Sequence, residues 1–236
     1  IATIVGARLG HCIFYQPEYY FGSWQGFLEI FQPWKGGLAS HGGAIALVLA
    51  MIWYARHYGR RNGFDFFWII DCLVITVCFA GALIPLGILC NSEIYGGPTT
   101  LPWGMYFMEN VYQHFASGAE PLWTEYPCHP TQLYEALSYL VLGLALQLTY
   151  KYRLEKLYRG EIFGIFLICL FGVRFLIEFI KNDQVDFEAG MAINMGQILS
   201  IPFILAGVVI LIYSFIRRKP ACSDAYLKAD GKKKQA

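Results

Sequence analysis

The chain has 236 residues, of which 56% are hydrophobic and only 15% are charged, and its formal net charge is +1. A soluble domain usually carries about 25% charged residues, so this composition excludes an ordinary soluble domain, and the net charge points to no charged partner. The seven cysteines form no CxxC pair and no zinc spacing, which excludes a disulfide framework.

Six apolar segments follow one another along the chain, and a membrane-spanning helix needs about 20 mostly apolar residues. The sequence therefore predicts an all-α, polytopic integral membrane protein. The six predicted helices are Ile1–Tyr15, Gly42–Tyr54, Phe66–Cys90, Leu133–Tyr150, Gly160–Ile180 and Met195–Ile216. The chain begins IATIVGAR, inside the first of these segments, and we expect it to be a fragment whose N-terminus is missing.

Positive charge is confined to alternate connections. The loop after the second helix, the loop after the fourth helix and the C-terminal tail hold 14 of the 18 Lys and Arg residues. The positive-inside rule places these three in the cytoplasm and the connections 16–41, 91–132 and 181–194 outside. We expect one transmembrane domain over residues 1–218 and a basic, disordered cytoplasmic tail over 219–236.

The outer loop 91–132 has no Lys or Arg, but it has four glutamates and many aromatic residues. The aromatic residues are Tyr95, Trp103, Tyr106, Phe107, Tyr112, Phe115, Trp123 and Tyr126. Such a loop is too apolar for disorder. Since Trp and Tyr favour the membrane interface, we expect an ordered cap there.

Four ionisable residues fall inside predicted helices, where each costs about 2.5–3.5 kcal/mol on insertion scales. Arg8 and Asp71 are expected to be structural, Asp71 as a hydrogen-bond acceptor. Arg174 and Glu178 are four residues apart and so share a helix face. They form either an internal ion pair or an arginine that is oriented by its glutamate toward an anionic ligand such as a phosphate.

Further polar residues lie at the outer ends of the predicted helices. His41 stands in GGLASHGGA, where it is either structural or suited to proton transfer. The glycines around it let the backbone approach a ligand. Asn91 and Glu93 end the third helix, and His129 opens HPTQLYE before the fourth. Their convergence predicts a site at the outer leaflet that acts on a polar headgroup.

Five separated stretches carry a family resemblance, and they occur in the family's order. They are GGLASHGGAI (36–45), NSEIYG (91–96), HPTQLYE (129–135), FGVRFLIEF (171–179) and NMGQILSIP (194–202). From Ile1 to about Ile216 the chain resembles the prolipoprotein diacylglyceryl transferases. Members of that family have one more N-terminal helix, which carries a functional tyrosine.

The resemblance implies transfer of a diacylglyceryl group from phosphatidylglycerol to the lipobox cysteine thiol of a prolipoprotein, in the bacterial cytoplasmic membrane. The expected partners are phosphatidylglycerol, lipobox signal peptides and membrane lipid, without nucleic acid; no cofactor or metal is expected. The resemblance assigns catalysis to His41, as the base, and to Arg174, which holds the lipid phosphate. It assigns substrate binding to Asn91, Glu93, Gly96, His129 and Glu178.

One stretch departs from the family pattern. The family signature reads Gly-Arg-x-Gly-Asn ahead of Asn-x-Glu, whereas this chain has Ile84-Pro85-Leu86-Gly87-Ile88. Pro85 thus replaces an arginine and Ile88 an asparagine, and proline also removes a backbone donor. The alternative hypothesis is therefore a catalytically degenerate paralogue that binds lipid or signal peptide without transfer.

Overall fold

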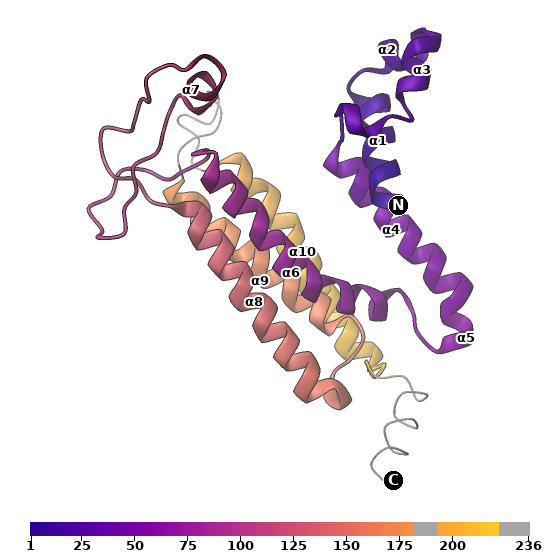
Figure 1. The fold of residues 1–236 in the computed structure, drawn as a ribbon. Coiled ribbons are helices and arrows are strands. Elements are labelled where there is room, and N and C mark those ends of the chain that lie inside the picture. Colours follow the sequence, from indigo (N-terminus) through magenta and orange to yellow (C-terminus); the bar gives the residue numbers. More distant parts are fainter. Residues whose placement is uncertain (182–192, 222–236) are drawn as a thin grey trace, which may run out of the picture. The chain divides into compact units, whose positions relative to one another are not determined.

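A computed structural model describes residues 1–181 and 193–221. The described chain is helical, its loops are joined by isolated bridges, and it divides into two compact units, Ile1–Ile69 and Ile70–Ser223 (Figure 1). Each unit is described by itself. All six predicted helices are present, which confirms the predicted fold class. Of the predicted tail, residues 222–236 lie outside the described residues.

The first unit is built on two helices that touch backbone to backbone. Its elements are α1 (Ala2–Phe14), α2 (Pro17–Gly22), α3 (Trp24–Glu29), η1 (Pro33–Lys35), α4 (Ser40–Tyr54), η2 (Ala55–Gly59, a π-turn) and α5 (Arg60–Asn62). A Cβ on Gly10 of α1 would lie 2.8 Å from the Cα of Gly42 in α4. Small residues at this crossing therefore allow the two helices to approach closely.

Arg8 of α1 is buried and organises the connection between α1 and α4. Its guanidinium donates hydrogen bonds to four carbonyl oxygens, those of Glu29, Ile30, Gly36 and Gly37, at 2.5–3.2 Å. It also lies over the ring of Tyr20, 5.0 Å from the centroid. Because these contacts satisfy the buried cation, the structural interpretation of Arg8 is confirmed.

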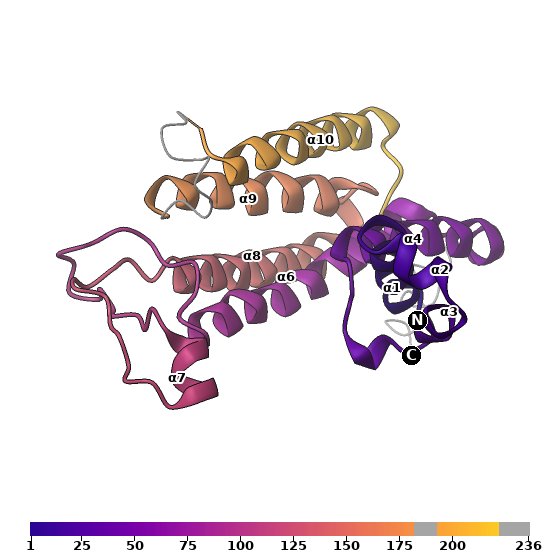
Figure 2. The same cartoon turned by 90° about the horizontal axis from the view of Figure 1, so that it is seen from above.

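The second unit is a bundle of four long helices. Its elements are α6 (Phe66–Cys90, whose first turn belongs to the first unit), α7 (Val111–Ser117), α8 (Thr131–Arg153), η3 (Leu154–Lys156), α9 (Glu161–Ile177), η4 (Glu178–Ile180) and α10 (Met195–Arg217). The four long helices lie side by side in both views (Figures 1 and 2). They are the four described helices that are long and apolar enough to cross a membrane, while α1 is a shorter apolar helix.

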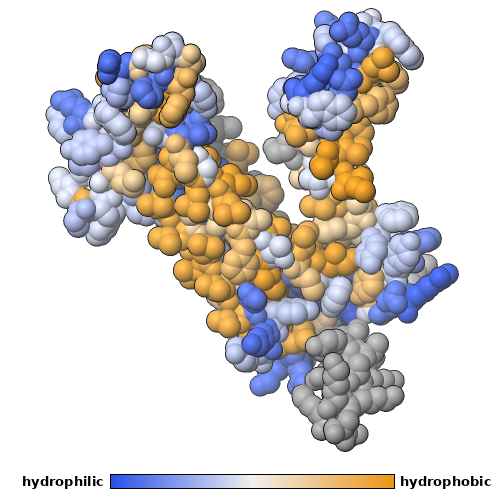
Figure 3. Space-filling view, viewed as in Figure 1, coloured by the Kyte–Doolittle hydropathy of each residue, from blue (hydrophilic) through white to orange (hydrophobic). Residues whose placement is uncertain are grey.

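The surface of the bundle agrees with a multi-pass membrane protein. On the face shown in Figure 3, apolar residues cover the helices and hydrophilic residues gather at the two ends of the bundle. Large apolar side chains of the spans, such as Leu83, Val141 and Val209, are exposed in the chain alone. A lipid environment covers such side chains at no hydrophobic cost.

Helices α6 and α8 run antiparallel in a fixed register. Three close approaches define it: Cys72 with Tyr150, Cys78 with Gly143, and Gly81 with Tyr139. In the first of these, the Cys72 sulfur lies 3.4 Å from the Tyr150 hydroxyl. Because the helices are antiparallel, each step forward along α6 is matched by a step backward along α8. Continuing this register puts Pro85 level with Glu135. It puts Ile88 level with Gln132.

The connections of the bundle meet at its two ends as the charge pattern predicts. At one end, the loop after α6 forms a backbone bridge between Gly96 and Lys181, after η4. At the other end, Tyr158 before α9 forms a bridge with Pro220, after α10. Within the bundle, the loop after α6 therefore shares one end with Lys181, and the loop after α8 shares the other end with the start of the tail.

The loop predicted to be an ordered cap is folded. Backbone bridges join Met105 to Cys128 and Met108 to Trp123. Phe107 between them is only 2% exposed and stacks on Tyr95 at 4.6 Å. Whether the cap lies at the membrane interface stays a prediction.

Candidate functional site

Four buried or partly buried charges gather where the cap meets the bundle. Arg174 of α9 lies close to the hydroxyl of Tyr139 on α8, and Glu135 and Glu178 are charged neighbours of the same tyrosine. The ammonium of Lys181 lies 2.8 Å from Glu135 Oε1 and 3.8 Å from Glu178 Oε2. We call these four charges and Tyr139 the ionic cluster.

The end of α9 explains how Glu178 enters this cluster. The α-helix stops at Ile177, and Glu178, whose backbone N–H still donates to the Arg174 carbonyl oxygen, begins a 3-10 turn that leads to Lys181. The start of α10 packs against this turn, since Asn194 forms a capping box with Gln197 and donates to the Glu178 carbonyl oxygen. A Cβ on Gly196 would lie 2.5 Å from Glu178 Cδ, so a side chain at this position would force the carboxyl group to move.

Glu93 is held in an unusual backbone. Ser92 and Ile94 on either side of it both have φ of 54°, and a β-branched residue rarely adopts the left-handed conformation. The Glu93 carbonyl oxygen accepts a 2.6 Å hydrogen bond from Gln132 Nε2, and its carboxylate accepts one from the Tyr112 hydroxyl in the cap. This acceptor raises the pKa of Tyr112. Such strain is typical of functional sites, so it supports the choice of Glu93.

Gly96 lies at the junction of the cap, α8 and the end of α9. A Cβ there would lie 2.6 Å from the Ile180 carbonyl oxygen and 2.8 Å from both His129 Cβ and Thr131 Cγ2. The Gly96 N–H donates to the His129 carbonyl oxygen at 2.8 Å. His129 Nδ1 lies 3.3 Å from the Tyr134 hydroxyl. Gly96 and His129 thus belong to the wall around the ionic cluster.

Gln132 is a buried residue that the sequence did not single out as a site residue. Its Nε2 donates a hydrogen bond to the Glu93 carbonyl oxygen, whereas its Oε1 is buried without a hydrogen-bond partner among the described residues. An unpaired buried acceptor costs about 1–3 kcal/mol. The α6–α8 register puts Ile88, whose side chain has no hydrogen-bond donor, at this level of the bundle.

His41 lies in the first unit, exposed near the start of α4. Its ring stands 5.6 Å from that of Phe14 and 5.8 Å from that of Tyr15. The neighbouring Gly42 packs against α1 rather than opening the backbone to a ligand, which differs from the expectation. The cause is helix packing, because a Cβ at Gly42 would meet Gly6 and Gly10. The approach of His41 to the ionic cluster stays a prediction.

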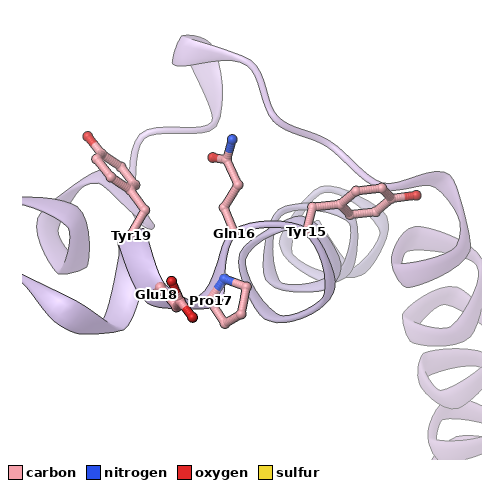
Figure 4. A pocket seen from close by; sticks show the side chains of 5 residues that line it. All are labelled: Tyr15, Gln16, Pro17, Glu18 and Tyr19. Carbon is pink, nitrogen blue, oxygen red and sulfur yellow. The ribbon is translucent and has the colours of Figure 1, made fainter.

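A pocket of about 590 Å³ opens beside His41. It is lined by five consecutive residues, Tyr15 to Tyr19. In Figure 4 the two tyrosine side chains point away from one another, with Gln16 between them. The lining includes none of the predicted site residues, so the convergent charges of the ionic cluster are the stronger candidate site.

The structure thus brings five predicted residues to one end of the bundle: Glu93, Gly96, His129, Arg174 and Glu178. Asn91, just past α6, is exposed. Sequence reasoning missed Gln132 and Tyr139 as site residues. The spacing of Gln132, Glu135 and Tyr139 was a usable signal, because residues three and seven apart lie on one helix face.

The fold and the ionic cluster define a polytopic membrane protein with a charged site where the spans meet a folded cap. A family model described as prolipoprotein diacylglyceryl transferase matches residues 1–213, and the chain belongs to this family. The expectation from the sequence is confirmed.

Three relatives named phosphatidylglycerol–prolipoprotein diacylglyceryl transferase illustrate the similarity. The one from Porphyromonas gingivalis is 44% identical over 218 residues, which cover 90% of this chain and 73% of the relative. The one from Tolumonas auensis is 40% identical, with 91% and 75% covered. The one from Bacteroides fragilis is 39% identical, with 89% and 73% covered.

Proposed function

We propose that this protein transfers the diacylglyceryl group of phosphatidylglycerol to the lipobox cysteine thiol of prolipoproteins. The observation that carries the proposal is the ionic cluster: Arg174, partly buried beside Tyr139, lies inside a chain that matches the transferase family over residues 1–213. A guanidinium in a water-poor site suits a phosphate better than any other side chain does.

The reaction makes one bond and breaks one bond. The cysteine sulfur forms a C–S bond with the glycerol carbon of the diacylglyceryl group, and the C–O bond from that carbon to the phosphate breaks. The thiol proton passes to a base, and glycerol phosphate leaves with the bonding electron pair. The thiol pKa is near 8.5, so a base is needed near neutral pH. We assign the base to His41.

The phosphate gains negative charge as the C–O bond breaks, and a fixed cation stabilises that charge. We assign this role to Arg174. Glu93, Gly96, His129 and Glu178 shape the wall around the leaving group, and Asn91 contacts the substrate at the end of α6. The end of the bundle that carries the cap then faces the outer leaflet of the bacterial cytoplasmic membrane, and the C-terminus faces the cytoplasm.

The test is complementation of a conditional transferase depletion with the full-length gene, together with transfer by purified protein. The substrates are phosphatidylglycerol and a lipobox peptide, and a peptide with serine in place of the cysteine is the control. Growth and a thioether-linked product are expected. A folded protein that neither complements nor modifies the cysteine peptide would leave lipid or signal-peptide binding without transfer as the function.

A further inference from the structure

Lys181 is a buried cation that the proposed reaction does not use. Its side chain is only 6% exposed, and the carboxylates of Glu135 and Glu178 that face it are 9% and 3% exposed. The two carboxylates come from different elements, α8 and η4. A buried lysine is costly unless it is paired, so this pairing is a specific feature of the site.

The backbone fixes where this ammonium lies. Lys181 forms a bridge with Gly96, and the Gly97 N–H donates to the Ile180 carbonyl oxygen at 3.0 Å. Gly96 belongs to the same short segment as Ser92 and Ile94, whose φ angles are positive. The position of the lysine is therefore coupled to the segment that forms the wall of the site.

Charge balance shows what Lys181 contributes. Among the described residues, the ionic cluster contains two carboxylates, Glu135 and Glu178, and two cations, Arg174 and Lys181. Without the lysine the cluster would carry a net negative charge and would repel an anion. Its carboxylates would also attract the guanidinium of Arg174, which a phosphate needs.

We propose that Lys181 is a positioning residue that gives the site its selectivity for a phospholipid whose headgroup has a net negative charge. It neutralises the two carboxylates and so leaves the charge of Arg174 available to the headgroup. This inference rests on the proposed function in one respect: the lipid headgroup is taken to bind beside Arg174.

The experiment compares the binding of phosphatidylglycerol and phosphatidylcholine to the purified full chain in neutral detergent, by native mass spectrometry. The parent should prefer phosphatidylglycerol. Lys181→Met should lower its affinity for phosphatidylglycerol about tenfold and change phosphatidylcholine binding much less, because the choline ammonium offsets the phosphate charge of that lipid. Lys181→Arg should keep the preference.

A charge-compensating variant separates this role from a merely structural one. Lys181→Met combined with Glu135→Gln restores the neutral cluster and should recover most of the preference. Lys35→Met removes an exposed lysine paired with Glu29 in the first unit and should change nothing. The proposal is overturned if the parent shows no preference, if Lys181→Met keeps it, or if the folded double variant does not recover it. Selective binding without transfer would refute the proposed function alone.

Discussion

The carboxylate of Asp71 in α6 accepts a 2.6 Å hydrogen bond from the backbone N–H of Gly160, which is 89 residues further along the chain. Its other oxygen accepts a 2.8 Å bond from the N–H of Phe163. Asp71 is 2% exposed and so caps the start of α9 from a neighbouring helix. The charge is placed where the positive end of the helix dipole favours an anion.

Asp71→Ala should destabilise the bundle, because each buried N–H that it leaves unpaired costs about 1–3 kcal/mol. The measurement is the thermal midpoint of the purified protein in detergent. Glu155→Ala, an exposed residue of η3 at the same end of the bundle, is the matched control and should leave the midpoint unchanged. Equal midpoints for the two variants would contradict the capping role.

His41→Gln should slow transfer about 10²–10⁴-fold, because glutamine cannot accept the thiol proton. The thermal midpoint should stay unchanged, since the side chain is exposed. The rate is measured with phosphatidylglycerol and a lipobox peptide. His57→Gln alters an exposed histidine that stacks on Trp53 at 5.4 Å, and it should retain the parent rate. A parent-like rate for His41→Gln would exclude this residue as the base.

Pro85→Arg together with Ile88→Asn should raise the transfer rate by about 10²–10³, the range known for one preorganised charge donor. The register puts the new guanidinium level with Glu135 and the new amide level with the unpaired Gln132 Oε1. Removing the proline also restores a backbone donor within α6.

The double variant is compared with both single variants at equal amounts of folded protein. Ile88→Asn alone should raise the thermal midpoint slightly, because the amide can donate to Gln132. If the folded double variant transfers no faster than the parent, the phosphate site is not limited by Pro85 and Ile88.

Gly96→Ala should lower both the thermal midpoint and the transfer rate, because the added Cβ would lie 2.6 Å from the Ile180 carbonyl oxygen. Gly87→Ala is the control within α6: no atom lies within 4 Å of its added Cβ. In a helix interior alanine is favoured over glycine by roughly 0.5–1 kcal/mol, so the control should be neutral or slightly stabilising. A fully active Gly96→Ala variant would show that the junction tolerates a side chain.

Ser117→Cys should react with an impermeant thiol reagent added outside the cell, and Ser223→Cys should not. Both are made in a variant without native cysteines. Ser117 ends α7 in the cap, which has no Lys or Arg, while Ser223 lies in the basic tail, outside the described residues. Labelling of Ser223→Cys alone would reverse the predicted orientation.

The sequence determined the helices because hydropathy is a local property. The prediction of Phe66–Cys90 matches α6 residue for residue, and Met195–Ile216 differs from α10 by one residue. The hydrogen-bonding role of Asp71 was also predictable, since a lone carboxylate in an apolar helix must find donors. Its partners were not, because they lie on another helix.

Only the tertiary structure decided how the charged residues pair. The spacing of Arg174 and Glu178 left an internal ion pair open, and only the structure brings Lys181, three residues further along, within 3.8 Å of the Glu178 carboxylate. From the sequence alone, the glycine at position 42 could allow close approach of a ligand or of a neighbouring helix. In the structure it packs against α1. Such pairings depend on the register and rotation of helices, which are set by side-chain packing across the whole bundle and not by any single stretch of sequence.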